Sequence, residues 1–82
     1  MDEVTMRYVD MGVEYELNGV TLQILGEYTN GEISISTSDL VLGYYERDED
    51  GDETVVTMLD GREFLLNSDE DYCALALTLL TE

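Results

Sequence analysis

Residues 13–24 read VEYELNGVTLQI, and this stretch decides the fold. Asn-Gly favours a type I′ turn, which has positive φ at both central residues and suits a two-residue hairpin loop. With Asn18-Gly19 as that loop, the pairs on one face are apolar: Val13 with Ile24, Tyr15 with Leu22, and Leu17 with Val20. The pairs on the other face are polar: Glu14 with Gln23, and Glu16 with Thr21. The stretch therefore predicts an antiparallel hairpin with one apolar and one carboxylate-bearing face.

A second Asn-Gly pair, at residues 30–31, predicts a third strand on the same sheet. With Asn30-Gly31 as a two-residue loop, the expected pairs are Tyr28 with Ile33 and Gly26 with Ile35 on the apolar face, and Glu27 with Ser34 on the other. Two turns that agree on the same apolar face are evidence for a consistent register.

The second half of the chain carries two Asp-Gly signals, at 50–51 and 60–61. A two-residue loop at Asp50-Gly51 would set like charges opposite each other, so we expect a longer loop there. Segments 40–47, 54–59 and 62–66 are rich in residues typical of strands. Apolar residues fall on both faces of the last two, at Val55, Val56, Leu65 and Leu66, which indicates a sheet covered on both sides.

Residues 67–82, NSDEDYCALALTLLTE, predict a helix. Ser68 and Asp71 form a start that resembles a capping box, and the acidic residues 69–71 lie where the helix dipole favours negative charge. Helical spacing is shown by Tyr72, Leu75, Ala76, Leu79 and Leu80. Cys73 is expected to be a small, buried apolar residue. Together with Leu77 it widens the apolar stripe beyond one face, so the helix would be deeply buried or part of a dimer contact. The residues of CALALTLL also alternate, which leaves a strand as the alternative.

We therefore predict one α+β domain over residues 1–82. It is an antiparallel β-meander of five to seven strands with one C-terminal α-helix packed on the sheet. Within it, Tyr44 and Tyr45 would point to opposite faces of one strand, so that one of them is exposed.

The charge of the chain is unusual: 20 Asp and Glu residues, three Arg, and no Lys or His give a formal net charge of −17. Such a field repels phosphate, so direct binding to nucleic acid or to an anionic membrane is excluded. Hydrophobic residues make up 44% of the chain, which is typical of a folded protein. The expected partner is a cation or a basic protein, such as a nucleic-acid-binding protein or a ribonucleoprotein.

The residues that most catalysts need are missing. Without His or Lys, the Ser-His and Ser-Lys arrangements and Schiff bases are impossible, and no phosphate-binding glycine motif is present. A pair of carboxylates could still hydrolyse a glycoside, but so small a domain offers little cleft between them. We predict a protein that is not an enzyme and that uses no cofactor.

Cys73 is the single cysteine, so there is no disulfide and no cysteine cluster for zinc. The first ten residues lack the features of a signal peptide, and no apolar run is long enough to span a bilayer. We expect a soluble, cytoplasmic protein.

The segment ERDEDGDE, residues 46–53, has the composition of a calcium loop. Counted from Asp48, the glycine falls at 51 instead of 53, position 12 is Leu59, and the flanks read as strands. The match to an EF-hand fails at these three points. We predict a solvated acidic loop and no dedicated metal site, with a weak Ca²⁺ or Mg²⁺ site as the alternative.

The carboxylates are the candidate partner-binding residues. On a sheet, alternate residues lie about 6.6 Å apart along a strand and about 4.8 Å apart between strands. The expected contact set has a grid on the first three strands (Glu14, Glu16, Glu27, Glu32), a loop cluster (Asp48, Glu49, Asp50, Asp52, Glu53) and a helix-start cluster (Asp69, Glu70, Asp71). Fixed negative charges at such spacings are similar to the phosphates of a nucleic acid strand.

In size, charge, lack of Lys and His, and compact β-rich plan, the chain resembles the small acidic proteins with which phages and mobile elements block host defence by imitating DNA. Anti-CRISPR and anti-restriction proteins belong to this group. The resemblance includes no motif. It implies a mode of action, namely occupation of the nucleic-acid-binding groove of a defence complex in the host cytoplasm, and no particular fold or residue.

Two other interpretations explain the same acidity. An immunity protein or antitoxin that neutralises a basic nuclease toxin would gain from the same electrostatic steering. A halophilic or weakly Ca²⁺-binding housekeeping domain would use the charge for solubility, although halophilic proteins usually carry many alanines and this chain has two, Ala74 and Ala76.

Overall fold

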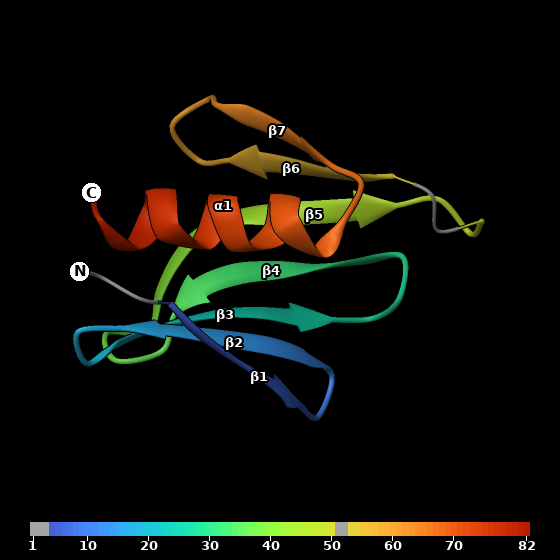
Figure 1. Cartoon of the computed structure of the whole chain (residues 1–82). Helices are drawn as coiled ribbons and strands as arrows, with labels where there is room; N and C mark the ends of the chain where they lie inside the picture. Colours follow the sequence, from blue (N-terminus) through green and yellow to red (C-terminus); the bar gives the residue numbers. More distant parts are fainter. Residues whose placement is uncertain (1–3, 51–52) are drawn as a thin grey trace.

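The computed structural model describes residues 4–50 and 53–82 and contains seven strands followed by one helix (Figure 1). The elements are β1 (Thr5–Val9), β2 (Gly12–Leu17), β3 (Val20–Gly26), β4 (Asn30–Ile35), β5 (Leu40–Arg47), β6 (Thr54–Met58), β7 (Glu63–Leu66) and α1 (Asp69–Leu80). Each strand pairs antiparallel with the next, so strand order in the sheet follows chain order. The predicted α+β meander with a C-terminal helix is confirmed.

The β2–β3 hairpin has the predicted register. Asn18 and Gly19 have φ of 52° and 82°, as a type I′ turn requires. Tyr15 pairs with Leu22, and the other predicted pairs are present as well. Local turn chemistry and the alternation of apolar residues therefore agree here.

The β3–β4 hairpin differs from the prediction. The backbone N–H of Glu27 donates to the carbonyl of Asn30 at 2.8 Å, so Tyr28 and Thr29 form the turn and Asn30-Gly31 begins β4. The expected pairs Tyr28–Ile33, Gly26–Ile35 and Glu27–Ser34 are wrong; the observed pairs are Gly26–Gly31, Ile24–Ile33 and Leu22–Ile35. Since each partner moves by four residues, an even number, Ile33 and Ile35 still face the apolar side.

The Tyr45 ring explains why the turn lies at Tyr28-Thr29 and not at Asn30-Gly31. It packs over the Gly26–Gly31 pair: a Cβ on Gly31 would lie 2.4 Å from Tyr45 Cε2, and a Cβ on Gly26 would lie 3.1 Å from the Tyr45 hydroxyl. That hydroxyl donates to the carbonyl of Glu27 at 2.7 Å. Gly31 therefore serves the packing of an aromatic ring from the neighbouring strand, and not the turn.

The loops at the two Asp-Gly signals are longer than two-residue turns. Arg47 pairs with Thr54, so the β5–β6 connection runs from 48 to 53 and is longer than two residues, as expected; Gly51 and Asp52 lie outside the described residues. At the Asp60-Gly61 signal, Met58 N–H donates to the carbonyl of Arg62, which gives a loop of residues 59–61 in which Gly61 has φ of 99°. This is a three-residue loop with glycine at the left-handed position.

Helix α1 lies in the curl of the sheet, where it contacts β2, β3 and β7 (Figure 1). Ser68 is its N-cap, and its side chain accepts a hydrogen bond from the backbone N–H of Asp71, as predicted. The core between helix and sheet consists of Tyr15, Leu22, Ile24, Ile33, Tyr45, Val56, Met58 and Leu66 from the strands and Leu75, Ala76 and Leu79 from the helix. No helix among the described residues has both the length and the hydropathy needed to cross a membrane.

No helix or strand in the described part of the chain packs on the other face of the sheet, here called the convex face. Val55 and Leu65 point to it and remain 40% and 53% exposed, so the expected double cover is wrong. Cys73, expected to be buried, is also exposed, and Leu77 is 42% exposed. One short helix covers one face of the sheet and buries only the stripe that it turns toward it.

The packing of Tyr45 on Gly31 can be tested with Gly31→Ala. We expect a loss of about 1–3 kcal/mol in the free energy of unfolding, because the new methyl group overpacks the contact with the ring and the β3 backbone. Urea unfolding followed by circular dichroism measures it. Ser34→Ala on the same strand is the control, and equal stability of the two variants would contradict the proposed packing.

Candidate functional site

The meander places alternate turns at the same end of the sheet. The β1–β2, β3–β4 and β5–β6 connections and the start of α1 lie together at the right of Figure 1. The β2–β3, β4–β5 and β6–β7 turns and the C-terminus lie at the opposite end. We call the first group the acidic end.

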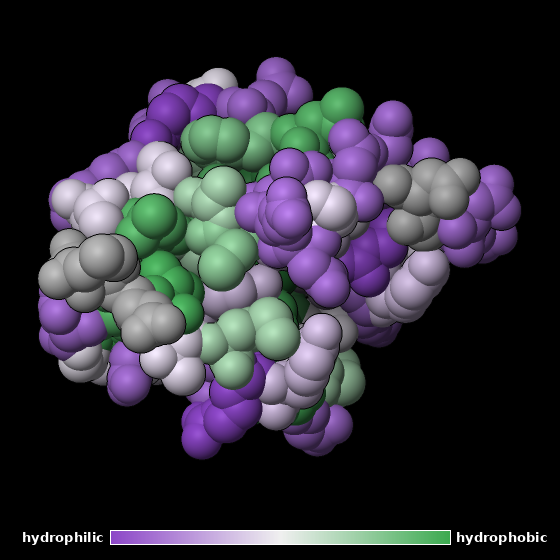
Figure 2. Space-filling model, in the orientation of Figure 1, coloured by the Kyte–Doolittle hydropathy of each residue, from purple (hydrophilic) through white to green (hydrophobic). Residues whose placement is uncertain are grey.

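The described carboxylates are unevenly distributed between the two ends of the sheet and its strands. The acidic end carries Asp10, Glu27, Asp48, Glu49, Asp50, Glu53, Asp69, Glu70 and Asp71, and the opposite end carries Asp39, Asp60 and Glu82. The strands carry Glu14, Glu16, Glu32, Glu46 and Glu63, all on the convex face. Figure 2 shows hydrophilic side chains gathered around the β5–β6 connection, at the right of the view.

The predicted contact residues separate into two groups in the structure. Those at the acidic end are Glu27, Asp48, Glu49, Asp50, Glu53, Asp69, Glu70 and Asp71, and those on the convex face are Glu14, Glu16 and Glu32. Asp52 lies outside the described residues. Glu27 belongs to the β3–β4 turn and not to the grid expected on the strands. Sequence reasoning missed Asp10 and Glu46, although an Asp two residues before Gly12 is a turn signal.

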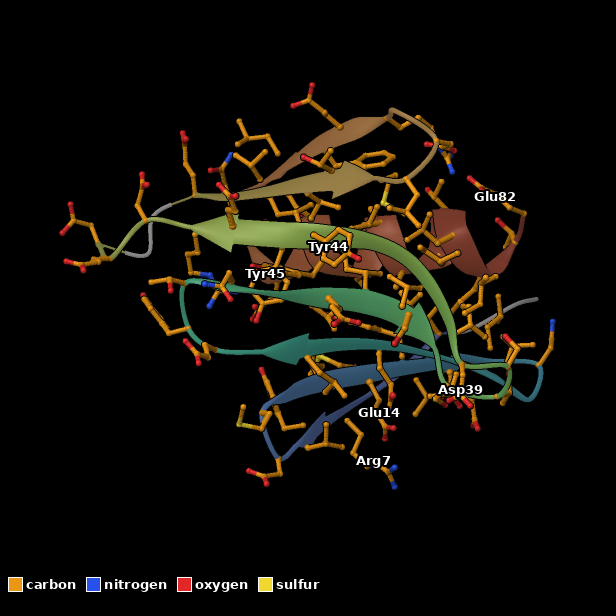
Figure 3. All side chains as sticks on the ribbon, turned by 180° about the vertical axis from the view of Figure 1, so that it is seen from behind. Arg7, Glu14, Asp39, Tyr44, Tyr45 and Glu82 are labelled. Atoms are coloured by element: carbon orange, nitrogen blue, oxygen red, sulfur yellow. The ribbon has the colours of Figure 1, made fainter. Side chains whose placement is uncertain are left out.

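Glu14 is held by its neighbours on the convex face. Its carboxylate forms an ion pair with Arg7 and accepts a hydrogen bond from Gln23 Nε2 at 2.7 Å, and its side chain is 13% exposed (Figure 3). The hydrogen bond from Arg7, with the one from Gln23, lowers the pKa of the Glu14 carboxyl. Glu14 therefore ties β1 to β2 and β3, and most of its charge is balanced locally.

Arg62 balances charge at the opposite end. Its guanidinium lies 2.7 Å from Asp60 Oδ2 and also pairs with Glu82. The contacts with Arg62 lower the pKa of both carboxyls. Because two of the acids at this end are paired, the field of the protein is stronger at the acidic end.

A groove of about 500 Å³ lies between the start of α1, the β1–β2 hairpin and the β3–β4 turn, and Figure 2 shows this hollow below the helix. Five of the six tyrosines line it: Tyr8, Tyr15, Tyr28, Tyr45 and Tyr72. The sixth, Tyr44, is 49% exposed on the convex face (Figure 3), while Tyr45 is buried, so the prediction that the two point to opposite faces is confirmed. We call this hollow the tyrosine groove.

Arg47 lies in the tyrosine groove and is held mainly by aromatic rings. Its Cζ is 5.1 Å from the ring centroid of Tyr28 and 5.5 Å from that of Tyr45. Its Nε donates to Thr54 Oγ1 at 3.0 Å, and its Nη2 donates to the Tyr72 hydroxyl at 2.9 Å. Within the described part of the chain Arg47 pairs with no carboxylate, unlike Arg7 and Arg62. The groove therefore binds a guanidinium through ring faces and hydroxyl groups.

Two groove tyrosines are fixed in the neutral state. Burial raises the pKa of Tyr15 to about 12, and burial also raises the pKa of Tyr45. At neutral pH both hydroxyls are protonated and add no negative charge to the groove, and that of Tyr45 donates to the carbonyl of Glu27.

Over residues 4–50 and 53–82, no three acidic or cysteine side chains come together in a way that could hold a metal ion. The calcium-loop hypothesis also involves Gly51 and Asp52, which are outside that range.

The role of Arg47 in holding the groove together can be tested with Arg47→Met. We expect the variant to lose about 1–3 kcal/mol of unfolding free energy, because both the stacking and the hydrogen bonds are removed. Arg7→Met, which removes an exposed ion pair, is the matched control and should cost less. Equal urea midpoints for the two variants would show that the ring contacts of Arg47 stabilise the fold no more than the exposed ion pair of Arg7 does.

The sequence matches no protein-family model, and comparison with curated proteins and with solved structures finds no significant match.

Proposed function

We propose that this protein is a non-enzymatic inhibitor whose acidic end occupies the nucleic-acid-binding groove of a host defence complex of the CRISPR or restriction type. The observation that supports it is the gathering of nine described carboxylates at one end of the sheet, where Arg47 is the one described cation. A surface of this kind is complementary to a groove lined with Lys and Arg.

The charge density is of the order that such a groove is built to bind. The Cα atoms extend over 35 × 23 × 23 Å, and the whole chain has a net charge of −17. Duplex DNA carries one charge per about 1.7 Å of axis, so a length similar to the long dimension of this protein carries roughly 20 charges. The total negative charge that this protein brings to a basic groove is therefore comparable to that of a DNA duplex of similar length.

Binding would follow the thermodynamics of DNA binding. Each carboxylate that meets a Lys or Arg side chain of the partner releases counterions, and the long-range field accelerates the encounter. The inhibitor needs no chemistry of its own, because it acts by preventing the nucleic acid from entering the groove.

A second candidate function is that of an immunity protein or antitoxin for a basic nuclease. The tyrosine groove favours it, because replacement of evenly spaced phosphates needs no pocket, whereas recognition of one particular protein gains from anchor sites. Both functions use the acidic end and differ in the partner.

Charge-led binding predicts a steep salt dependence. We expect a panel of purified CRISPR effectors, restriction enzymes and nuclease toxins to contain a target that this protein inhibits. Its affinity for that target should fall about a thousandfold between 50 and 200 mM NaCl, as expected for several phosphate-like contacts. Excess duplex DNA should compete with the inhibitor, as measured by fluorescence anisotropy. An affinity that does not change with salt would refute charge mimicry.

Two variants of equal net charge separate the acidic end from the rest of the surface. The triple variant Asp48→Asn, Glu49→Gln, Asp50→Asn removes three charges from the acidic end, and Glu16→Gln, Asp39→Asn, Glu63→Gln removes three elsewhere. We expect the first to weaken binding to the target at least tenfold more than the second, because only the first removes charges at the contact. Equal losses would show that net charge, and not its placement, drives binding.

A further inference from the structure

The tyrosine groove exposes rings that nothing in the described chain covers. Tyr8 is 72% exposed and Tyr28 is 57% exposed, and Met11 beside them is 58% exposed. Such a concentration of exposed aromatic and thioether surface around one hollow is typical of an interaction site.

The groove already shows which group its rings accept. The guanidinium of Arg47 lies over Tyr28 and Tyr45 without a described carboxylate partner. Within the described residues, no cation lies over the ring of Tyr8 on the other side of the groove. The same lining therefore offers a second, open ring face of the kind that Arg47 uses.

The surroundings of the groove favour a cation as the occupant. Asp69 lines the groove, and Asp10, Glu27 and Asp48 belong to the connections around it. These carboxylates outnumber the single charge of Arg47, so the local field attracts a positive group. Arginine fits better than lysine, because its planar, weakly hydrated head stacks on a ring and can also donate to a carboxylate.

We propose that the tyrosine groove binds an arginine side chain of the basic partner, with the guanidinium stacked on the open ring face of Tyr8, beside Tyr28, and donating hydrogen bonds to Asp69. This inference rests on the proposed function, since it assumes a basic partner at the acidic end. It gives the surface a specificity that net charge alone does not have, because long-range attraction to a carboxylate cluster depends on the charge of the partner and not on the shape of its cationic group.

Hexa-arginine and hexa-lysine peptides test the proposal on the intact protein labelled with ¹³C-tyrosine. We expect hexa-arginine to bind roughly two- to fivefold more tightly than hexa-lysine at equal ionic strength, as expected for one cation–π contact at an accessible site. The NMR signals of the Tyr8 and Tyr28 rings should shift, and that of Tyr44, on the convex face, should stay in place.

The variants Tyr8→Leu and Tyr44→Leu are matched, because each removes one exposed ring and keeps an apolar side chain. Tyr8→Leu should abolish the preference for arginine, and Tyr44→Leu should keep it. Equal affinity of the wild-type protein for both peptides, or shifts at Tyr44 as large as those at Tyr8, would overturn the proposal.

The outcomes also separate this inference from the proposed function. Salt-dependent binding of both peptides with equal affinity would remove the arginine site and leave the acidic end as a binding surface. If neither peptide binds at 50 mM NaCl, both ideas fail. Inorganic phosphate at the same ionic strength should leave the NMR signals of Tyr8 and Tyr28 unshifted. If phosphate shifts these signals and hexa-arginine does not, the groove binds an anion at Arg47 and the proposal is wrong.

Discussion

The contact between the Tyr45 ring and the glycine pair Gly26–Gly31 connects the fold to the candidate site. It fixes the register of β3 against β4, since only residues without a Cβ leave room for the ring. The same register places Tyr28 in the turn, where it meets the guanidinium of Arg47. A packing contact inside the sheet thereby positions the groove at its end.

Charge is the second constraint on this protein. A net charge of −17 on 82 residues destabilises the compact state through self-repulsion, and the core under one helix must offset it. The repulsion would be smaller if the carboxylates were spread evenly, yet the described acids concentrate at the acidic end while Arg7 and Arg62 pair with carboxylates elsewhere. An arrangement that costs stability indicates a use for that surface, in keeping with the way in which functional sites depart from the most stable design.

The site combines two kinds of surface that act at different ranges. The carboxylates act over about a Debye length and bring a basic partner to the acidic end without fixing its orientation. The tyrosine groove acts only in contact, and its shape and ring faces select a particular side chain. Since a fold by itself does not imply a function, the proposals rest on this combination of residues and not on the architecture of the sheet.

The sequence alone determined the features that depend on neighbouring residues. The β2–β3 hairpin and the capped helix were predictable, because an Asn-Gly turn, the alternation of apolar residues and a Ser68 cap act within a few positions. The total charge was equally plain. The tertiary structure decided the β3–β4 turn, because Tyr45, remote in sequence, outweighs the local preference of Asn30-Gly31. It also decided the exposure of Cys73, Val55 and Leu65, because one helix covers only one face of the sheet. The tyrosine groove is likewise a product of the tertiary structure. Its rings come from β1, β2, the β3–β4 turn, β5 and α1, and they lie together only because the whole sheet curls.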